Sequence, residues 1–257
     1  MTDLQDMALW APTLLLVTVR VAGMAMVAPV FGSPAVPVKL RLVVSAAMAL
    51  GAVGLLGRPV ALPTSGFDLA MGLVCEAIIG AAIGYAARLI VAGVELGAFQ
   101  VSSQMGLSLA ELIGGGADSP SSIGGLFRLL AVVVFLAVGG HRALVGGLLD
   151  SLQLLPPMGF TPSAGILDVL VGCLAAAFVL ALKVAAPVLV ALLLATVALG
   201  LLHRTVPQCN LLTMGIPVRV MLGLTAVAAS LAAVTPLMEQ AAGELGRSIQ
   251  ALALAAR

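Results

Sequence analysis

Long stretches with almost no charged residue constrain this chain more than any other feature of its sequence. Six of them are visible, at residues 8–30, 42–57, 67–94, 124–149, 165–202 and 216–238. At about 1.5 Å per helical residue, most are long enough to cross a hydrocarbon layer of about 30 Å. Charged residues make up only 9% of the chain, too few to surround a core of this size with a polar shell. We therefore expect lipid or other protein subunits to cover the apolar surface.

The apolar segments are predicted to be helices, because none shows the alternating pattern of a transmembrane strand. The expected fold is an all-α membrane protein of one domain over residues 1–257, with six helices, or seven if 165–202 divides. The ring of Pro187 would clash with the carbonyl of Lys183 and kink or break that segment. Residues 238–257 are expected to form an amphipathic tail, whose apolar side carries Leu237, Ala241, Leu245, Ile249 and Leu252.

Charge limits both the topology and the partners of this chain. In a six-crossing arrangement the Lys and Arg residues divide almost evenly between the two sides, so the positive-inside rule gives no orientation. Either a boundary is misplaced or some segments never span lipid.

The net charge is +1 without a basic cluster, which argues against nucleic-acid binding. The acidic start, with Asp3 and Asp6, lacks the positive region of a signal peptide, so the first helix is expected to remain.

The third apolar segment carries a ridge of evenly spaced residues. Every fourth position is small or charged, which places one set on one face of a helix: Gly72, Glu76, Gly80, Gly84 and Arg88. Small residues at this spacing let another backbone approach closely. The ridge therefore predicts a helix-packing seam.

Charged side chains inside apolar segments need partners, because an unpaired charge in an apolar environment is costly. Glu76 and Arg88 lie about 18 Å apart along one helix and are too distant to pair. Glu76 either belongs to a proton or polypeptide pathway or pairs with an arginine from Arg20, Arg128 and Arg219. Lys183 is expected to be a buried charge of the fifth segment.

A polar stripe and a glycine-rich loop follow the third segment. Polar residues at offsets of four, four and three predict a helical face that meets water or a polar partner: Gln100, Gln104, Ser108 and Glu111. The next residues cannot continue a helix, because consecutive glycines and a proline oppose it: Gly114, Gly115, Gly116, Ala117, Asp118, Ser119 and Pro120. This stretch is the clearest loop of the chain.

The sequence contains no recognisable catalytic, cofactor or metal motif. Phosphate-loop, zinc-protease and nucleophile-elbow patterns are absent from it. His141 and His203 lack neighbours at metal-ligand spacing, and Cys75 and Cys173 lie in uncharged runs where thiols pack as small apolar groups. We expect no enzyme activity, catalytic residue, metal or cofactor.

Several short patterns, in order along the chain, resemble those of one protein family. The most specific is Arg204-Thr205-Val206-Pro207-Gln208-Cys209-Asn210, followed by Gly215-Ile216-Pro217-Val218-Arg219. It is similar to the R-x-x-P-Q-x-N and G-x-P-x-[KR] motifs of the FliR family of flagellar type III export-gate proteins. Other matching landmarks are Arg20 with Pro29-Val30-Phe31-Gly32, Glu76 with Gly80 and Gly84, Gln104-Met105-Gly106, and Gly139-Gly140-His141.

The resemblance to the FliR family implies a function as well as a fold. It implies a FliP-like part followed by a FliQ-like hairpin, within a gate built with FliP-like and FliQ-like subunits. FlhB-like and FlhA-like export components are further implied partners, unfolded flagellar proteins are the implied cargo, and the implied location is the flagellar basal body of the bacterial inner membrane. Gly114 to Asp118 lie where FliR-like proteins carry a pore-closing plug, although a simple connector remains open. Subunit contacts are implied for Arg204, Pro207, Gln208, Asn210, Pro217 and Arg219.

Two alternative functions stay open at this point. The homologous subunit of a virulence type III secretion system, the SctT-type component, shares the architecture, and Gly215 to Arg219 favours the flagellar branch. A small secondary transporter or ion channel could instead use Glu76, Arg88 and Lys183 along a path at mid-membrane depth. An inverted-repeat transporter should show matching broken helices in both halves, whereas the only break expected here lies at Lys183 to Pro187.

Overall fold

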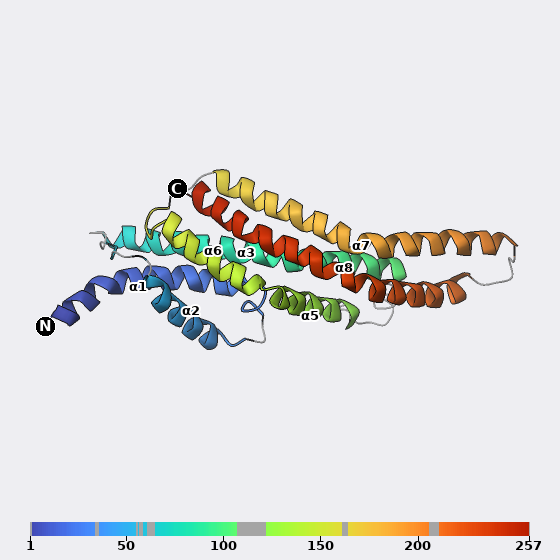
Figure 1. Ribbon diagram of the computed structural model, residues 1–257, viewed down its shortest axis with the longest axis horizontal. Coiled ribbons are helices and arrows are strands. Elements are labelled where there is room, and N and C mark those ends of the chain that lie inside the picture. Colours follow the sequence, from blue (N-terminus) through green and yellow to red (C-terminus); the bar gives the residue numbers. More distant parts are fainter. Residues whose placement is uncertain are drawn as a thin grey trace. The chain divides into compact units, whose positions relative to one another are not determined.

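The computed structural model describes residues 2–33, 36–54, 56, 59–60, 65–106, 122–160, 164–205 and 211–256. Within these ranges the chain is helical and contains no strand (Figure 1). The helices are α1 (Thr2–Val27), α2 (Val38–Val53), α3 (Gly66–Met105), α5 (Ser122–Ala137), α6 (Gly140–Leu154), α7 (Ala164–Thr205) and α8 (Leu211–Ala255).

Three of these helices are long and apolar enough to cross a membrane. Their candidate spans are Trp10–Val27, Gly66–Met105 and Ala164–Leu202, and the number rises to five if two interrupted helix pairs each count as one span. Backbone polar groups in lipid must be satisfied within the segment, and helices achieve this. The prediction of an all-α membrane protein is confirmed.

The helix boundaries differ from the predicted segments at several places. The segment expected over 124–149 is two helices, because Gly139 has a φ of 85° in the left-handed region and ends the helical path. The fifth segment, in which a kink or break was expected near Lys183, does not divide, since α7 is one helix that continues through Pro187. One proline removes one backbone hydrogen bond, whereas a break in an apolar setting would leave several polar groups unsatisfied. Helix α8 joins the last segment and the tail through Pro236, with a bend near Ala232.

The chain divides into two compact units, and α3, α7 and α8 contribute to both. Unit 1 comprises Met1–Leu89, Gly139–Ala175 and Ala242–Arg257, whereas unit 2 comprises Ile90–Val138 and Ala176–Ala241. In unit 1, α2 packs against α1, and the core includes Val17, Met24, Ile83, Leu148 and Ile249. The core of unit 2 is formed by Val101, Met105, Ala185, Val188 and Leu192.

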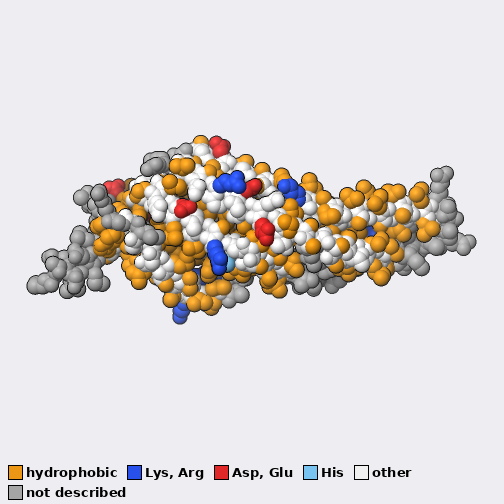
Figure 2. Space-filling model, viewed as in Figure 1, with side chains coloured by type: hydrophobic (Ala, Val, Ile, Leu, Met, Phe, Trp, Pro, Cys, Tyr) orange, Lys and Arg blue, Asp and Glu red, His pale blue; other side chains and the backbone are white. Residues whose placement is uncertain are grey.

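Many large apolar side chains remain on the surface. Examples from α2, α3 and α7 are Leu50, Phe67 and Leu194, which are 68%, 71% and 65% exposed. Figure 2 shows apolar side chains over most of the visible face and only scattered charged ones. Single exposed apolar residues are normal in soluble proteins, but so continuous a covering is not. This surface therefore requires lipid or protein around it.

Candidate functional site

A buried ion pair joins α1 to α3 in unit 1. The guanidinium of Arg20 donates from Nε to Oε2 of Glu76 over 2.5 Å and from Nη2 to Oε1 over 3.1 Å. Both residues are 0% exposed. A two-point arginine–carboxylate contact fixes distance and orientation together. The pair thus neutralises both charges and sets how α1 lies on α3 at this level.

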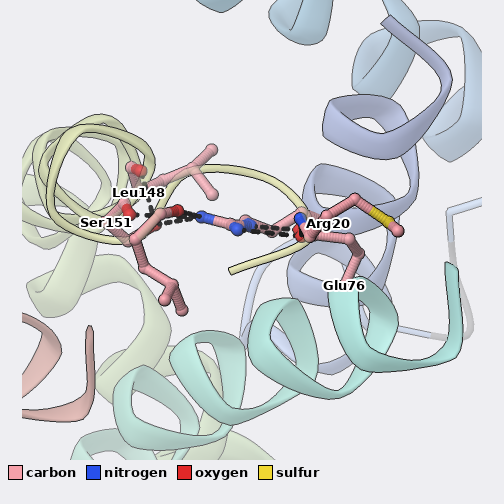
Figure 3. Close-up of polar contacts among 6 residues, drawn as sticks. Arg20, Glu76, Leu148 and Ser151 are labelled. Carbon is pink, nitrogen blue, oxygen red and sulfur yellow. Dashed lines mark hydrogen bonds and ion pairs between the residues drawn. The ribbon is translucent and has the colours of Figure 1, made fainter. Parts of the chain in front are cut away.

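The remaining side of Arg20 faces the end of α6, as Figure 3 shows with the guanidinium between Glu76 and Ser151. Its Nη1 donates to the backbone carbonyls of Ser151 over 3.2 Å and Leu155 over 3.0 Å, and to Ser151 Oγ over 3.4 Å. The last carbonyls of a helix lack partners inside it and carry partial negative charge. Helix α6 has no basic residue of its own in its last turn. Arg20 supplies that positive charge from another helix.

Glu76 also holds the turn that follows α6. The backbone N–H of Met158 donates to Glu76 Oε1 over 3.1 Å, and Gly159 N–H donates to the carbonyl of Pro156 over 3.0 Å. Met158, the third residue of this turn, has a φ of 70°, a conformation that glycine or asparagine usually adopts there. Its thioether lies where a Cβ on Gly72 would be. Gly72 and Glu76, one turn apart on α3, therefore fix both the side chain and the backbone of Met158.

Close backbone contact between α1 and α3 accompanies the ion pair. A Cβ on Gly80 would overlap the carbonyl oxygen of Arg20, and a Cβ on Gly84 would lie 2.5 Å from the carbonyl oxygen of Met24. From the other side, a Cβ on Gly23 would lie 2.5 Å from the carbonyl oxygen of Ala77. No side chain fits at such distances, so these three positions need glycine. Gly80 and Gly84 belong to the ridge predicted from the sequence, together with Gly72 and Glu76, which are also buried.

Unit 2 contains a second glycine seam, which the sequence interpretation missed. Cβ atoms on Gly93 and Gly97 of α3 would each lie 2.7 Å from a carbonyl oxygen of α7, that of Ala177 and that of Ala181. The two glycines have the same four-residue spacing as Gly80 and Gly84, so the signal was present in the sequence. Helix α3 thus approaches α1 closely in one unit and α7 closely in the other.

The other charged residues singled out from the sequence lie in different surroundings. Arg128 of α5 pairs with Glu95 of α3 over 3.4 Å, and both side chains are partly exposed. Arg88 is half-buried, and neither of the ion pairs among the described residues includes it. Lys183, expected to be a buried charge, is exposed, because none of the described residues covers that side of α7.

The residues of the family motif are only partly described. Arg204 lies in the last turn of α7, and its side chain is outside the described part, as are Pro207, Gln208 and Asn210. Pro217 is exposed on α8. The Nε of Arg219 is buried and has no hydrogen-bond partner among the described residues. The proposed plug residues, Gly114 to Asp118, also lie outside the described residues.

The polar groups of the buried centre, formed by Arg20, Glu76, Ser151, Leu155 and Met158, are satisfied by one another. Both carboxylate oxygens of Glu76 accept hydrogen bonds, and Ser151 Oγ donates to the carbonyl of Leu148 over 2.7 Å. His141 is exposed, and the described residues contain no cluster of three His, Cys, Asp or Glu side chains that could hold a metal ion. Sequence reasoning missed Ser151, Leu155 and Met158. Leu155 and Met158 contribute only backbone atoms to the centre, so side-chain patterns could not reveal them.

Comparison with known proteins identifies relatives over nearly the whole chain. The family model described as bacterial export proteins, family 1, matches residues 11–245. The flagellar biosynthetic protein FliR of Bacillus subtilis is 29% identical over 214 residues, which are 81% of this chain and 82% of the relative. FliR of Escherichia coli is 28% identical over 234 residues, or 88% and 87% of the two chains. The Yop proteins translocation protein T of Yersinia pestis is 28% identical over 156 residues, 60% of each chain.

Proposed function

This chain belongs to the bacterial export proteins of family 1, and on that premise we propose that it is a non-enzymatic subunit of the flagellar type III export gate. In this role it assembles with FliP-like and FliQ-like subunits around a conduit for unfolded flagellar proteins. FlhB-like and FlhA-like export components are further proposed partners. The proposed location is the flagellar basal body in the bacterial inner membrane.

One observation carries this proposal beyond family membership. The two charged side chains that are fully buried pair with each other inside the chain, whereas much of the apolar surface has no cover. Arg20 and Glu76 neutralise each other and are fully enclosed. In contrast, large apolar side chains on α2, α3 and α7 remain exposed. A protein whose work was chemistry at the membrane would place its ionisable groups in an accessible cavity. This arrangement instead supports a subunit that contributes surface to an assembly.

The flagellar branch is favoured because several FliR proteins are similar to this chain over most of its length. The FliR proteins of B. subtilis and E. coli cover 81% and 88% of this chain, whereas the Yersinia translocation protein covers 60%. The motif at Gly215 to Arg219 supports the same choice. The homologous subunit of a virulence secretion system remains the alternative within the family.

Two roles are proposed for parts of the chain in the assembled gate. The seam of Gly72, Glu76, Gly80 and Gly84, together with Arg20, sets the spacing of α1, α3 and the end of α6. The glycine-rich stretch Gly114 to Asp118 serves as a plug that closes the conduit. The family motif at residues 204–210 and its continuation to Arg219 are proposed to contact other subunits. The buried Nε of Arg219, which has no partner among the described residues, supports this.

Copurification tests the proposed function. The chain would be tagged and expressed with the FliP-like and FliQ-like proteins of the same bacterium, then solubilised in detergent. We expect a complex of all three, because the exposed apolar faces are covered only in the assembly. The same tag on an unrelated helical membrane protein is the control. Recovery of the chain only as a stable, solitary monomer under these conditions would overturn the proposal.

The transporter alternative finds no support at its central residue. A substrate or proton path through Glu76 would need a free carboxylate oxygen, but Oε2 accepts from Arg20 and Oε1 accepts from both Arg20 and Met158. Purified chain in liposomes provides the direct test. Movement of a small solute by the chain alone, without other subunits, would favour the transporter over the gate.

A further inference from the structure

Lys183 is an exposed charge in the middle of an apolar helix. It lies 19 residues after Ala164 and 22 residues before Thr205, the two ends of α7. At 1.5 Å per residue, each end is on the order of 30 Å away along the helix. Asp168 is the only other Asp, Glu, Lys or Arg between Ala164 and His203. Helix α7 is thus about twice as long as a hydrocarbon layer of about 30 Å, so lipid alone cannot cover all of its exposed apolar surface.

The surroundings of Lys183 on the surface are apolar. Exposed residues at offsets of three and four define one stripe of α7, here called the Lys183 stripe: Val179, Lys183, Pro187, Val190, Leu194 and Val197. Its valines and leucine are 52–65% exposed. The opposite side of α7 carries Ala185, Val188 and Leu192, which are buried in the core of unit 2. The stripe is thus a side of α7 that the described residues do not cover.

The amine of Lys183 has no partner within the described residues. The ion pairs there are Arg20 with Glu76 and Arg128 with Glu95, and no hydrogen bond from Lys183 is formed. An unpaired ammonium enclosed among apolar side chains is strongly unfavourable. A negative charge from outside the chain is therefore required to stabilise it.

We propose that the Lys183 stripe is a contact surface for an apolar helix of a different subunit, and that this helix places an Asp or Glu carboxylate against Lys183. This inference rests on the proposed function, because it requires that the chain works inside an assembly. Apolar side chains along the stripe supply the packing area. The carboxylate fixes the position of the partner helix along α7 and favours the correct partner, because a misplaced helix would leave two charges unpaired.

Three other occupants fit the stripe less well. A second copy of this chain would bring Lys183 toward a like charge, which opposes a symmetric contact. A water-filled conduit wall would be expected to carry further polar side chains, and the stripe has none besides Lys183. Lipid tails match the apolar residues but offer no anion, and a hydrocarbon layer of about 30 Å covers only about half of α7. Charge and composition together select a partner helix with a carboxylate.

Two substitutions at one position test the contact in the complex formed with the coexpressed FliP-like and FliQ-like proteins. Lys183→Glu should reduce copurification of the partner on the order of a hundredfold, because two buried carboxylates would then face each other. Lys183→Met keeps the length and apolar stem of the side chain, yet should also weaken the complex, since the partner carboxylate would lose its counter-charge. Lys39→Glu is the matched control: Lys39 is exposed in the first turn of α2, and its reversal should leave copurification unchanged.

A photoreactive residue at Val190 provides an independent readout of what covers the stripe. We expect crosslinks to a protein subunit, and we expect an Asp→Lys or Glu→Lys change in that subunit to restore assembly of the Lys183→Glu variant. Unchanged copurification of Lys183→Met, or crosslinks to lipid alone, would overturn the inference while the gate subunit proposal stands. If the unaltered chain recovers neither partner, the proposed function itself fails and the inference fails with it.

Discussion

The guanidinium of Arg20 and the carboxylate of Glu76, 56 residues apart in the sequence, form a two-point ion pair that is completely enclosed by unit 1. Each partner also receives backbone groups from the end of α6 and the turn after it. Three segments of unit 1 therefore meet at one pair of charges. Loss of either charge should disturb all three.

Removing one member of this pair should strongly destabilise the protein. Glu76→Gln leaves the Arg20 charge buried with no counter-ion, and such changes cost about 3–5 kcal/mol. Replacing both residues, as in Arg20→Met with Glu76→Leu, should recover much of this loss because no buried charge remains. Thermal unfolding of the detergent-solubilised complex measures both effects.

The partly exposed pair in unit 2 is the matched control for this experiment. Glu95→Gln removes a carboxylate from the same helix, α3, that pairs with Arg128 over 3.4 Å while partly exposed. Solvent screens such a pair, so the expected cost is below about 1 kcal/mol. Equal unfolding temperatures for the Glu76→Gln and Glu95→Gln variants would contradict the structural role assigned to the buried pair.

The glycine seam makes a second prediction. Gly80→Ala would place a methyl group on the backbone carbonyl of Arg20, so α1 and α3 must separate and the ion pair must lengthen. Overpacking of this kind costs about 1–3 kcal/mol. Gly51→Ala, on α2, adds a methyl group with no atom within 4 Å and should be neutral or slightly stabilising. Unfolding of the two variants side by side gives the comparison, and an equally stable Gly80→Ala variant would show that the seam tolerates separation.

Spacing in the sequence was sufficient to find one side of the buried centre but not the other. Gly72, Glu76, Gly80 and Gly84 share a helical face at four-residue intervals, so a packing seam with a charge in it could be predicted. The choice of Arg20 over Arg128 and Arg219 could not, because it depends on which helices are neighbours. The contributions of Leu155 and Met158 were hidden for a different reason: backbone carbonyls and N–H groups carry no signature in side-chain identity.

The same reasoning explains the differences in helix boundaries. The apolar run over 124–149 does not reveal whether Gly139 adopts a left-handed conformation, since glycine accepts both hands. Pro187 was a stronger signal, yet α7 continues through it, because the apolar surroundings penalise a helix break more than one missing hydrogen bond. Sequence patterns thus predicted the existence and type of the elements better than their ends.

The turn after α6 makes a third prediction. Met158 has a φ of 70°, which β-branched residues rarely tolerate. Met158→Val should therefore destabilise unit 1 by about 1–3 kcal/mol, whereas Met158→Asn, which accepts this conformation, should cost less. Thermal unfolding of the complex distinguishes the two, and a Val variant as stable as the Asn variant would show that the turn can change its conformation without losing the Glu76 contact.

Deletion of residues 114–120 tests the proposed plug. If this stretch closes the conduit, its removal should make membranes leaky to small ions while the complex still assembles, because the seams at Gly80, Gly84, Gly93 and Gly97 remain. Conductance of planar bilayers or the ion sensitivity of growing cells measures the leak, and copurification measures assembly. Replacing the stretch with a Gly-Ser linker of equal length separates closure from simple connection, since such a linker preserves the connection without the native residues. A leak in the deletion and linker variants supports a plug, whereas unchanged conductance in both would assign the stretch to a connector between α3 and α5.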